Sequence, residues 1–168
     1  MSWVEDIKNR IPDYAKDMRL NLDTIANRST LDQDVVKGIC LAAAFATGNK
    51  QLTDEIANHC DDETRNAAFT AASLMAMTNM WYPYVEMTGD PDLKGLPPGL
   101  RMNAIMSHGG TTKVKFEAYS LAASIVGRCH FCVKAHYDTL KKEGMSVDQL
   151  RDVGRTAAIV HSVAKVLS

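Results

Sequence analysis

The chain has 168 residues, of which 46% are hydrophobic and 23% are charged, and its formal net charge is −1 at pH 7. This length and composition are normal for a single folded domain with its own core, which excludes an intrinsically disordered chain. The balance of 19 Lys and Arg against 20 Asp and Glu argues against nucleic-acid binding, and no basic cluster indicates a membrane surface.

The start of the chain indicates where the protein works. Glu5 and Asp6 stand where a secretion signal would have its apolar core. The longest apolar stretch, residues 39–46, is far too short to span a bilayer. We therefore expect a cytoplasmic protein with no membrane association.

Helical periodicity dominates the first half of the sequence. Apolar residues recur at Tyr14, Met18, Leu22 and Ile25, with spacings of four, four and three. Thr30 and Gln33 have the spacing of a capping box at the start of the next helix. The predicted helices run from residue 13 to 27, from 29–30 to 48–49, from 51 to 59, and from about 61–63 to about 79.

An irregular segment separates these helices from the second half. Residues 88–99 contain three Gly and three Pro, which predicts a surface loop within one domain. Further helices are predicted at about 100–107, 112–127, 129–143 and 147–167, the last with a capping box from Ser146 to Gln149. No segment has a strand pattern. The sequence thus predicts a single all-α domain over residues 1–168.

Two short features of this domain have less specific meanings. The match between residues 41–43 and 121–123, both Leu-Ala-Ala, is explained by chance, although an internal duplication of a helical unit would also produce it. The aromatic residues Trp81, Tyr82 and Tyr84 are expected to form a packing cluster or an oligomer contact.

The four cysteines fall into two groups. Cys40 lies in an apolar run and is expected to be a small buried residue, and Cys60 has no functional interpretation. Cys129 and Cys132 form a Cys-x-x-Cys pair, which in a cytosolic chain indicates metal binding or redox activity.

The Cys-x-x-Cys pair has the setting that thiol chemistry requires. Gly127 is predicted to end one helix, so Cys129 stands in the first turn of the next, where the helix dipole favours a thiolate. At 100° per residue, Cys132 lies about 60° and His136 about 20° from Cys129 on the helical wheel. Both thiols and a candidate base or proton carrier therefore share one face of a helix.

Glu117 is a second candidate for proton transfer. It lies about 60° from the centre of the apolar stripe of the preceding helix, at the margin of a buried face. A carboxylate in that position is partly desolvated and can exchange a proton near neutrality. If the two helices pack face to face around Gly127, Glu117 comes close to His136.

Other interpretations of the pair are weaker. Cys129, Cys132 and His136 have plausible spacing for a structural zinc site in a non-enzymatic helical oligomer, but a second half-site is missing. Haem attachment requires a histidine where Val133 stands, and a thioredoxin-type site requires a strand before the motif.

The pattern of Glu117, eleven residues, Cys129-x-x-Cys132 and then His136 resembles the AhpD alkylhydroperoxidase family, within the wider carboxymuconolactone decarboxylase-like superfamily. The resemblance extends over nearly the whole chain. Other segments that resemble the family are residues 11–22, 31–33, 98–103 and 157–160.

This resemblance implies an all-helical AhpD-like fold, a trimer or hexamer, and antioxidant peroxidase activity on organic hydroperoxides without a bound cofactor or metal. It implies that Cys132 is the peroxidatic thiol, that Cys129 resolves it as a disulfide, and that Glu117 and His136 relay the proton. The implied reductant is an external dithiol, supplied by a lipoylated acyltransferase or an adaptor, and the peroxiredoxin AhpC is a further implied partner. A carboxymuconolactone decarboxylase-type activity is the alternative, but that branch generally lacks the Cys pair.

One position departs from the family pattern. The family usually has a histidine directly before the second Cys, where this chain has Phe131, and His130 lies one residue earlier. Because one residue is about 100° around a helix, His130 cannot simply replace the missing histidine and is expected to have a minor role. A disulfide oxidoreductase with weak peroxidase activity is also consistent with this departure.

Overall fold

A computed structural model describes residues 2–168, and every regular element in that range is a helix. The all-α prediction is therefore confirmed. None of these helices is both long and apolar enough to cross a membrane. In chain order the elements are α1 (Ser2–Arg10), the 3₁₀ helix η1 (Asp13–Ala15), α2 (Lys16–Asn27), α3 (Gln33–Thr47), α4 (Lys50–Ala57), α5 (Asp62–Thr88), α6 (Pro91–Gly95), the 3₁₀ helix η2 (Asn103–Gly110), α7 (Lys113–Gly127), α8 (His130–Lys142) and α9 (Val147–Val166).

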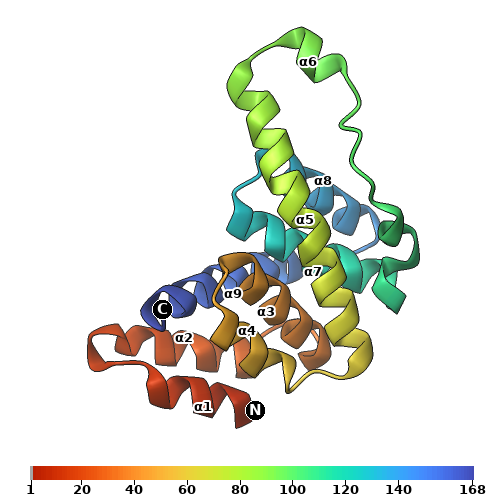
Figure 1. Cartoon of the computed structure of the whole chain (residues 1–168). Coiled ribbons are helices and arrows are strands. Elements are labelled where there is room, and N and C mark those ends of the chain that lie inside the picture. Colours follow the sequence, from red (N-terminus) through yellow and green to blue (C-terminus); the bar gives the residue numbers. More distant parts are fainter. Residues whose placement is uncertain (1) are drawn as a thin grey trace.

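Helix α7 lies at the centre of the molecule and packs against α3, α5, α8 and α9 (Figure 1). Small side chains allow this close packing, because alanines occupy many of the contact positions and are fully buried. They include Ala42, Ala43, Ala67, Ala68, Ala71, Ala118, Ala122 and Ala123. Helices α1 and α2 cover the end of the bundle opposite α6 (Figure 1).

Helix α5 is longer than the sequence predicts. It was expected to end near Asn79, but it continues through Pro83 to Thr88. Proline within a helix removes one backbone hydrogen bond and kinks or ends many helices, but here the helix continues beyond it. The last two turns of α5, together with α6 and the start of the next loop, form an arm (residues 81–98) that projects beyond the bundle (Figure 1).

Four other parts of the predicted fold need correction. Helix α1 was not predicted at all. The expected capping box of Thr30 and Gln33 is wrong, because α3 begins at Gln33 and Thr30 instead donates from its backbone N–H and its hydroxyl to the carboxylate of Asp152, at 2.7 and 2.9 Å. The 88–99 segment contains α6, and the helix expected at 100–107 is the 3₁₀ helix η2.

The second half follows the prediction more closely. Helices α7, α8 and α9 lie within a residue or two of the expected positions, and the capping box of Ser146 and Gln149 is confirmed by reciprocal hydrogen bonds of 3.0 and 3.2 Å.

The turn between α7 and α8 is fixed by two unusual backbone positions. Gly127 is helical, and its lack of a side chain allows α5 to approach, since a Cβ there would lie 2.1 Å from Nδ2 of Asn79. Arg128 then adopts a left-handed conformation (φ 55°) that ends α7. This turn places Cys129 at the N-cap of α8.

Candidate redox site

Cys129 and Cys132 form a disulfide across the first turn of α8, with their Cα atoms 5.2 Å apart. As the N-cap residue, Cys129 also accepts a hydrogen bond through Sγ from the backbone N–H of Cys132, at 3.2 Å. Cys129 is fully buried and Cys132 is 3% exposed. The N–H donor and the positive end of the helix dipole would stabilise a thiolate on Cys129 once the disulfide is reduced.

Glu117 and His136 form a buried ion pair beside this turn. Oε2 of Glu117 lies 2.6 Å from Nδ1 of His136, and both side chains are only 12% exposed. Glu117 comes from α7 and His136 from α8, two helices that pack against each other. The contact expected from the helical wheels is therefore present.

The other nitrogen of His136 lies against a sulfur atom. Nε2 is 3.0 Å from Sδ of Met75, a buried residue of α5. A thioether sulfur can only accept a hydrogen bond, so this contact is a hydrogen bond when Nε2 carries a proton. With Glu117 at Nδ1 and Met75 at Nε2, the imidazole is held in one orientation between α7 and α5.

Helix α5 also contacts the sulfur of Cys129. The carbonyl oxygen of Thr78 is 3.8 Å from this Sγ and can accept a hydrogen bond from the thiol in the reduced state. The hydroxyl of Thr78 lies 3.6 Å from Sδ of Met75. Sequence reasoning missed both residues, because they are 51 and 61 positions away from their partners and belong to no motif.

His130 and Phe131 face the arm rather than the Glu117–His136 pair. His130 is largely exposed, and its Nδ1 lies 3.2 Å from Oε1 of Glu86 on α5. The ring of Phe131 stacks on Tyr82, with ring centroids 4.1 Å apart. The structure therefore brings together Cys129, Cys132, Glu117 and His136, and it separates His130 from them.

The other two cysteines are buried away from this turn. Burial raises the pKa of Cys60 to about 11 and raises that of Cys40 still further. Both therefore remain protonated thiols at neutral pH and are poor nucleophiles.

The zinc interpretation is not supported by the position of His136. Its two ring nitrogens are directed at Glu117 and Met75 and not at the cysteine sulfurs. Within residues 2–168, no three His, Cys, Asp or Glu side chains come together as metal ligands.

Comparison with known proteins identifies relatives of the whole chain. The model of the carboxymuconolactone decarboxylase family matches residues 91–168. An alkyl hydroperoxide reductase AhpD of Rhodospirillum centenum is 42% identical over 168 residues, which cover 98% of this chain and 90% of that protein. Proteins of the same name from Coxiella burnetii and Brucella canis are 39% and 38% identical, over 97% and 98% of this chain and 96% and 95% of their own lengths.

Proposed function

The chain belongs to the AhpD family of alkyl hydroperoxide reductases, and on this basis we propose that it reduces organic hydroperoxides through the dithiol and disulfide forms of Cys129 and Cys132. The observation that most supports this proposal is the disulfide in the first turn of α8, with the buried Glu117–His136 pair beside it. The names of the full-length relatives favour a peroxidase over a decarboxylase.

The first step is attack by the thiolate of Cys132 on one oxygen of the hydroperoxide. The O–O bond breaks, Cys132 becomes a sulfenic acid, and the alkoxide takes a proton and leaves as an alcohol. The Glu117–His136 pair is the proposed source of this proton and the proposed acceptor of the thiol proton of Cys132 beforehand, through an intervening water, since neither ring nitrogen of His136 is directed at a cysteine sulfur. The assignment of attack to Cys132 rests on the family resemblance.

The second step is attack by Cys129 on the sulfur of the sulfenic acid. The S–O bond breaks, the oxygen leaves as water, and the disulfide forms. The two thiols together give up two electrons and two protons, which convert the hydroperoxide into one alcohol and one water. The N–H of Cys132 supports the role of Cys129 as the resolving thiol, because it stabilises a thiolate there.

The disulfide must then be reduced by an external dithiol. We assign this role to a lipoyl group of an acyltransferase or to an adaptor, and AhpC is a further candidate partner in a reducing, cytoplasmic compartment. Attack on Cys132 is favoured, since the leaving Cys129 thiolate is then stabilised by the helix N-terminus, and Cys132 is the slightly more exposed residue of the two. Turnover with dihydrolipoamide and dihydrolipoamide dehydrogenase, followed by NADH consumption, tests this assignment against monothiols such as glutathione.

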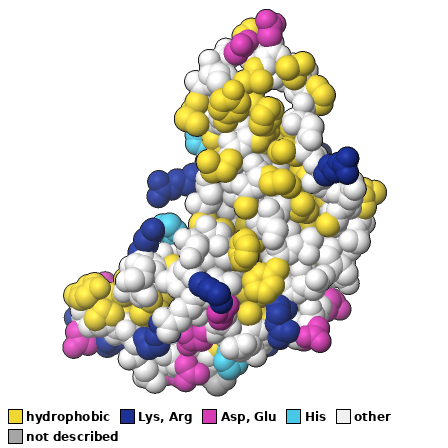
Figure 2. Space-filling model, in the orientation of Figure 1, with side chains coloured by type: hydrophobic (Ala, Val, Ile, Leu, Met, Phe, Trp, Pro, Cys, Tyr) yellow, Lys and Arg dark blue, Asp and Glu magenta, His cyan; other side chains and the backbone are white. Residues whose placement is uncertain are grey.

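We also propose that the chain assembles into a trimer or hexamer through one side of α5. Phe69, Met77, Met80 and Tyr84 lie within a sector of about 80° on the helical wheel, and the last three are exposed. Figure 2 shows hydrophobic side chains gathered along this side of α5 and on its projecting end. Exposed apolar patches of this kind mark interaction sites in folded proteins.

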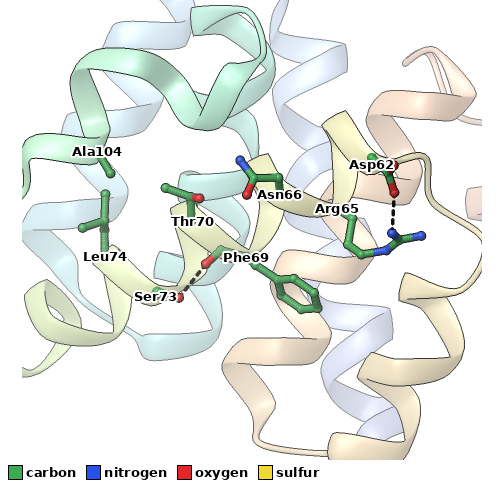
Figure 3. Close-up of a pocket in the computed structure, with 8 residues that line it drawn as sticks. All are labelled: Asp62, Arg65, Asn66, Phe69, Thr70, Ser73, Leu74 and Ala104. Atoms are coloured by element: carbon green, nitrogen blue, oxygen red, sulfur yellow. Dashed lines mark hydrogen bonds and ion pairs between the residues drawn. The ribbon is translucent and has the colours of Figure 1, made fainter.

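A hollow of about 530 Å³ at the other end of α5 borders this surface (Figure 3). Seven of its eight lining residues belong to α5, and Leu74 is directed toward Ala104 of η2 (Figure 3). Its one cation, Arg65, is already bonded to Asp62 and to the carbonyl oxygens of Ala57 and Cys60. The hollow therefore offers no free cation for a ligand, and we assign it to the border of the proposed subunit contact.

Light scattering tests the subunit contact directly. Met80→Glu is expected to convert the oligomer into monomers, whereas Leu20→Glu, at an exposed position of α2, is expected to leave its mass unchanged. A monomeric wild type would reject the contact.

The catalytic assignment is tested by comparing wild type with Cys129→Ser and Cys132→Ser, using cumene hydroperoxide and a dithiol. Cys132→Ser is expected to be inactive. Cys129→Ser is expected to accumulate a sulfenic acid at Cys132 that a dimedone probe labels. Unchanged turnover in Cys132→Ser would reject the assignment.

A further inference from the structure

A hollow of about 690 Å³ opens between the arm and the first turn of α8. Its volume lies within the usual range of small-molecule sites. Three charged residues line it, Glu86, Asp90 and Lys94, but the wall is otherwise mainly apolar. The large apolar and aromatic residues are Trp81, Tyr82, Val85, Leu93, Leu96 and Phe131.

Phe131 connects this hollow to the redox turn. It is the residue directly before Cys132, and adjacent Cα atoms are about 3.8 Å apart. Its ring is stacked on Tyr82 and remains more than half exposed on the hollow. An apolar group that packs against this ring is held beside the first turn of α8, where Cys132 follows Phe131 at about 100° around the helix without lining the hollow itself.

The hollow adjoins the apolar side of α5 that we assign to the subunit contact, because the ring of Trp81, which lines the hollow, lies 5.8 Å from that of Tyr84, but the two surfaces do not coincide. On the helical wheel, Tyr82 and Val85 lie roughly 100–160° away from Met80 and Tyr84. A neighbouring subunit that covers Met80 therefore need not fill the hollow, which leaves it available to a small molecule.

We propose that this hollow binds the apolar substituent of the hydroperoxide, so that Phe131 and the arm select hydroperoxides with bulky, uncharged, apolar substituents over hydrogen peroxide. The proposal rests on the function proposed above and specifies its substrate class. The hydroperoxide gives up its oxygen as in that scheme, and the hollow contributes binding alone. Hydrogen peroxide has no substituent to place there and gains nothing from it.

The preference is measured as the ratio of kcat/KM for cumene hydroperoxide to kcat/KM for hydrogen peroxide. Removing an apolar contact from a binding pocket costs about tenfold or more in discrimination. Phe131→Ala and Leu93→Ala are each expected to lower the ratio by about that factor. Because both substrates share the same thiol chemistry, a general effect of Phe131→Ala on Cys132 cancels in the ratio.

Leu93→Ala and Leu20→Ala form a matched pair of truncations. Leu93 belongs to α6 and lines the hollow, whereas Leu20 is exposed on α2 at the opposite end of the molecule. Leu20→Ala is expected to leave the ratio unchanged. The proposal is overturned if the ratio is the same in wild type, Phe131→Ala and Leu93→Ala. It is also overturned if Leu93→Ala changes the mass of the oligomer but leaves the ratio unchanged.

Binding can be measured without turnover. The chain has two tryptophans, and Trp81 lines the hollow whereas Trp3 is buried in α1. Cumyl alcohol, the expected product, should change the tryptophan fluorescence of wild type but not of Trp81→Phe. Binding of cumyl alcohol by a protein that reduces no hydroperoxide would reject the proposed function and retain the site. Turnover without this fluorescence change and with an unaltered ratio would reject the site and retain the function.

Discussion

The substitution Glu117→Gln separates a proton relay from a merely structural ion pair. The glutamine keeps the size of the side chain and an oxygen that can accept from Nδ1 of His136, but it removes the negative charge and the exchangeable proton. Two unit charges 4 Å apart attract by about 4 kcal/mol at an effective dielectric constant of 20. Desolvation of two side chains that are 12% exposed offsets part of this, and a hydrogen bond to a charged group contributes roughly 1.5–3 kcal/mol.

These magnitudes give two different expectations for kcat/KM. A loss limited to the hydrogen bond amounts to roughly 10- to 100-fold, at about 1.4 kcal/mol per factor of ten. Loss of a general acid–base group costs about 10²–10⁴-fold. We expect the larger value, because the amide cannot exchange a proton with the thiol or the leaving alkoxide.

The assay is steady-state reduction of cumene hydroperoxide with dihydrolipoamide as the electron donor. His136→Ala is expected to lose as much activity as Glu117→Gln, and the double variant little more, since residues that act as a unit are not additive. His130→Ala is the matched control, because that imidazole is 82% exposed and bonded to Glu86. A loss below about 100-fold in Glu117→Gln, or a larger loss in His130→Ala than in Glu117→Gln, would refute the relay.

Three further predictions concern stability and thiol reactivity. Gly127→Ala is expected to cost about 1–3 kcal/mol of unfolding free energy, because its Cβ would overlap the side chain of Asn79. Adding Asn79→Ala should restore part of the Tm that Gly127→Ala loses. Losses of Tm that simply add in the double variant would contradict the overlap. Burial raises the pKa of Asp152, but the hydrogen bonds from Thr30 and the charges of two arginines outweigh burial, so the net pKa is lowered. The stability that the Asp152 carboxylate contributes is therefore present above pH ~4 and is lost as pH falls through the lowered pKa. Thermal unfolding from pH 2.5 to 6 should therefore show a steeper acid loss in wild type than in Asp152→Asn, and equal slopes would contradict it. Cys40 and Cys60 should resist alkylation at pH 8 until the protein unfolds, and mass spectrometry showing rapid labelling of the native protein would contradict their burial.

The parts of the fold that could be predicted depend on local signals. Helices α7, α8 and α9 begin and end at turn residues and caps that are visible in the sequence, such as Ser146 with Gln149. Thr30 has the same kind of signal but bonds to Asp152, which is 122 positions away, so tertiary contact outweighs the local pattern. Helix α1 could have been found from the spacing of Trp3, Val4 and Ile7, all of which are buried.

The path of α5 could not be predicted for a different reason. Pro83 and the nearby turn residues indicate an end of the helix, yet the chain continues to Thr88 and builds the arm. Stacking of Tyr82 on Phe131 and the pairing of Glu86 with His130 join this extension to α8. These contacts arise only after the two helices have packed.

The residues of the candidate site also differ in whether local sequence signals or tertiary contacts determine their positions. Glu117 and His136 could be paired from helical wheels, since they lie on consecutive helices joined by a tight turn. Met75 and Thr78 could not, because they come from α5, and nothing in the sequence indicates which of its faces contacts α8.

The central claim, that Cys129 and Cys132 form a two-electron redox pair, is tested most directly by a single-equivalent titration. Fully reduced protein has four thiols per chain when counted after unfolding. One equivalent of cumene hydroperoxide should lower this count to two, yield one equivalent of cumyl alcohol, and give a disulfide that peptide mapping assigns to Cys129 and Cys132. An unchanged count, or a bond that involves Cys40, Cys60 or a second chain, would contradict the account.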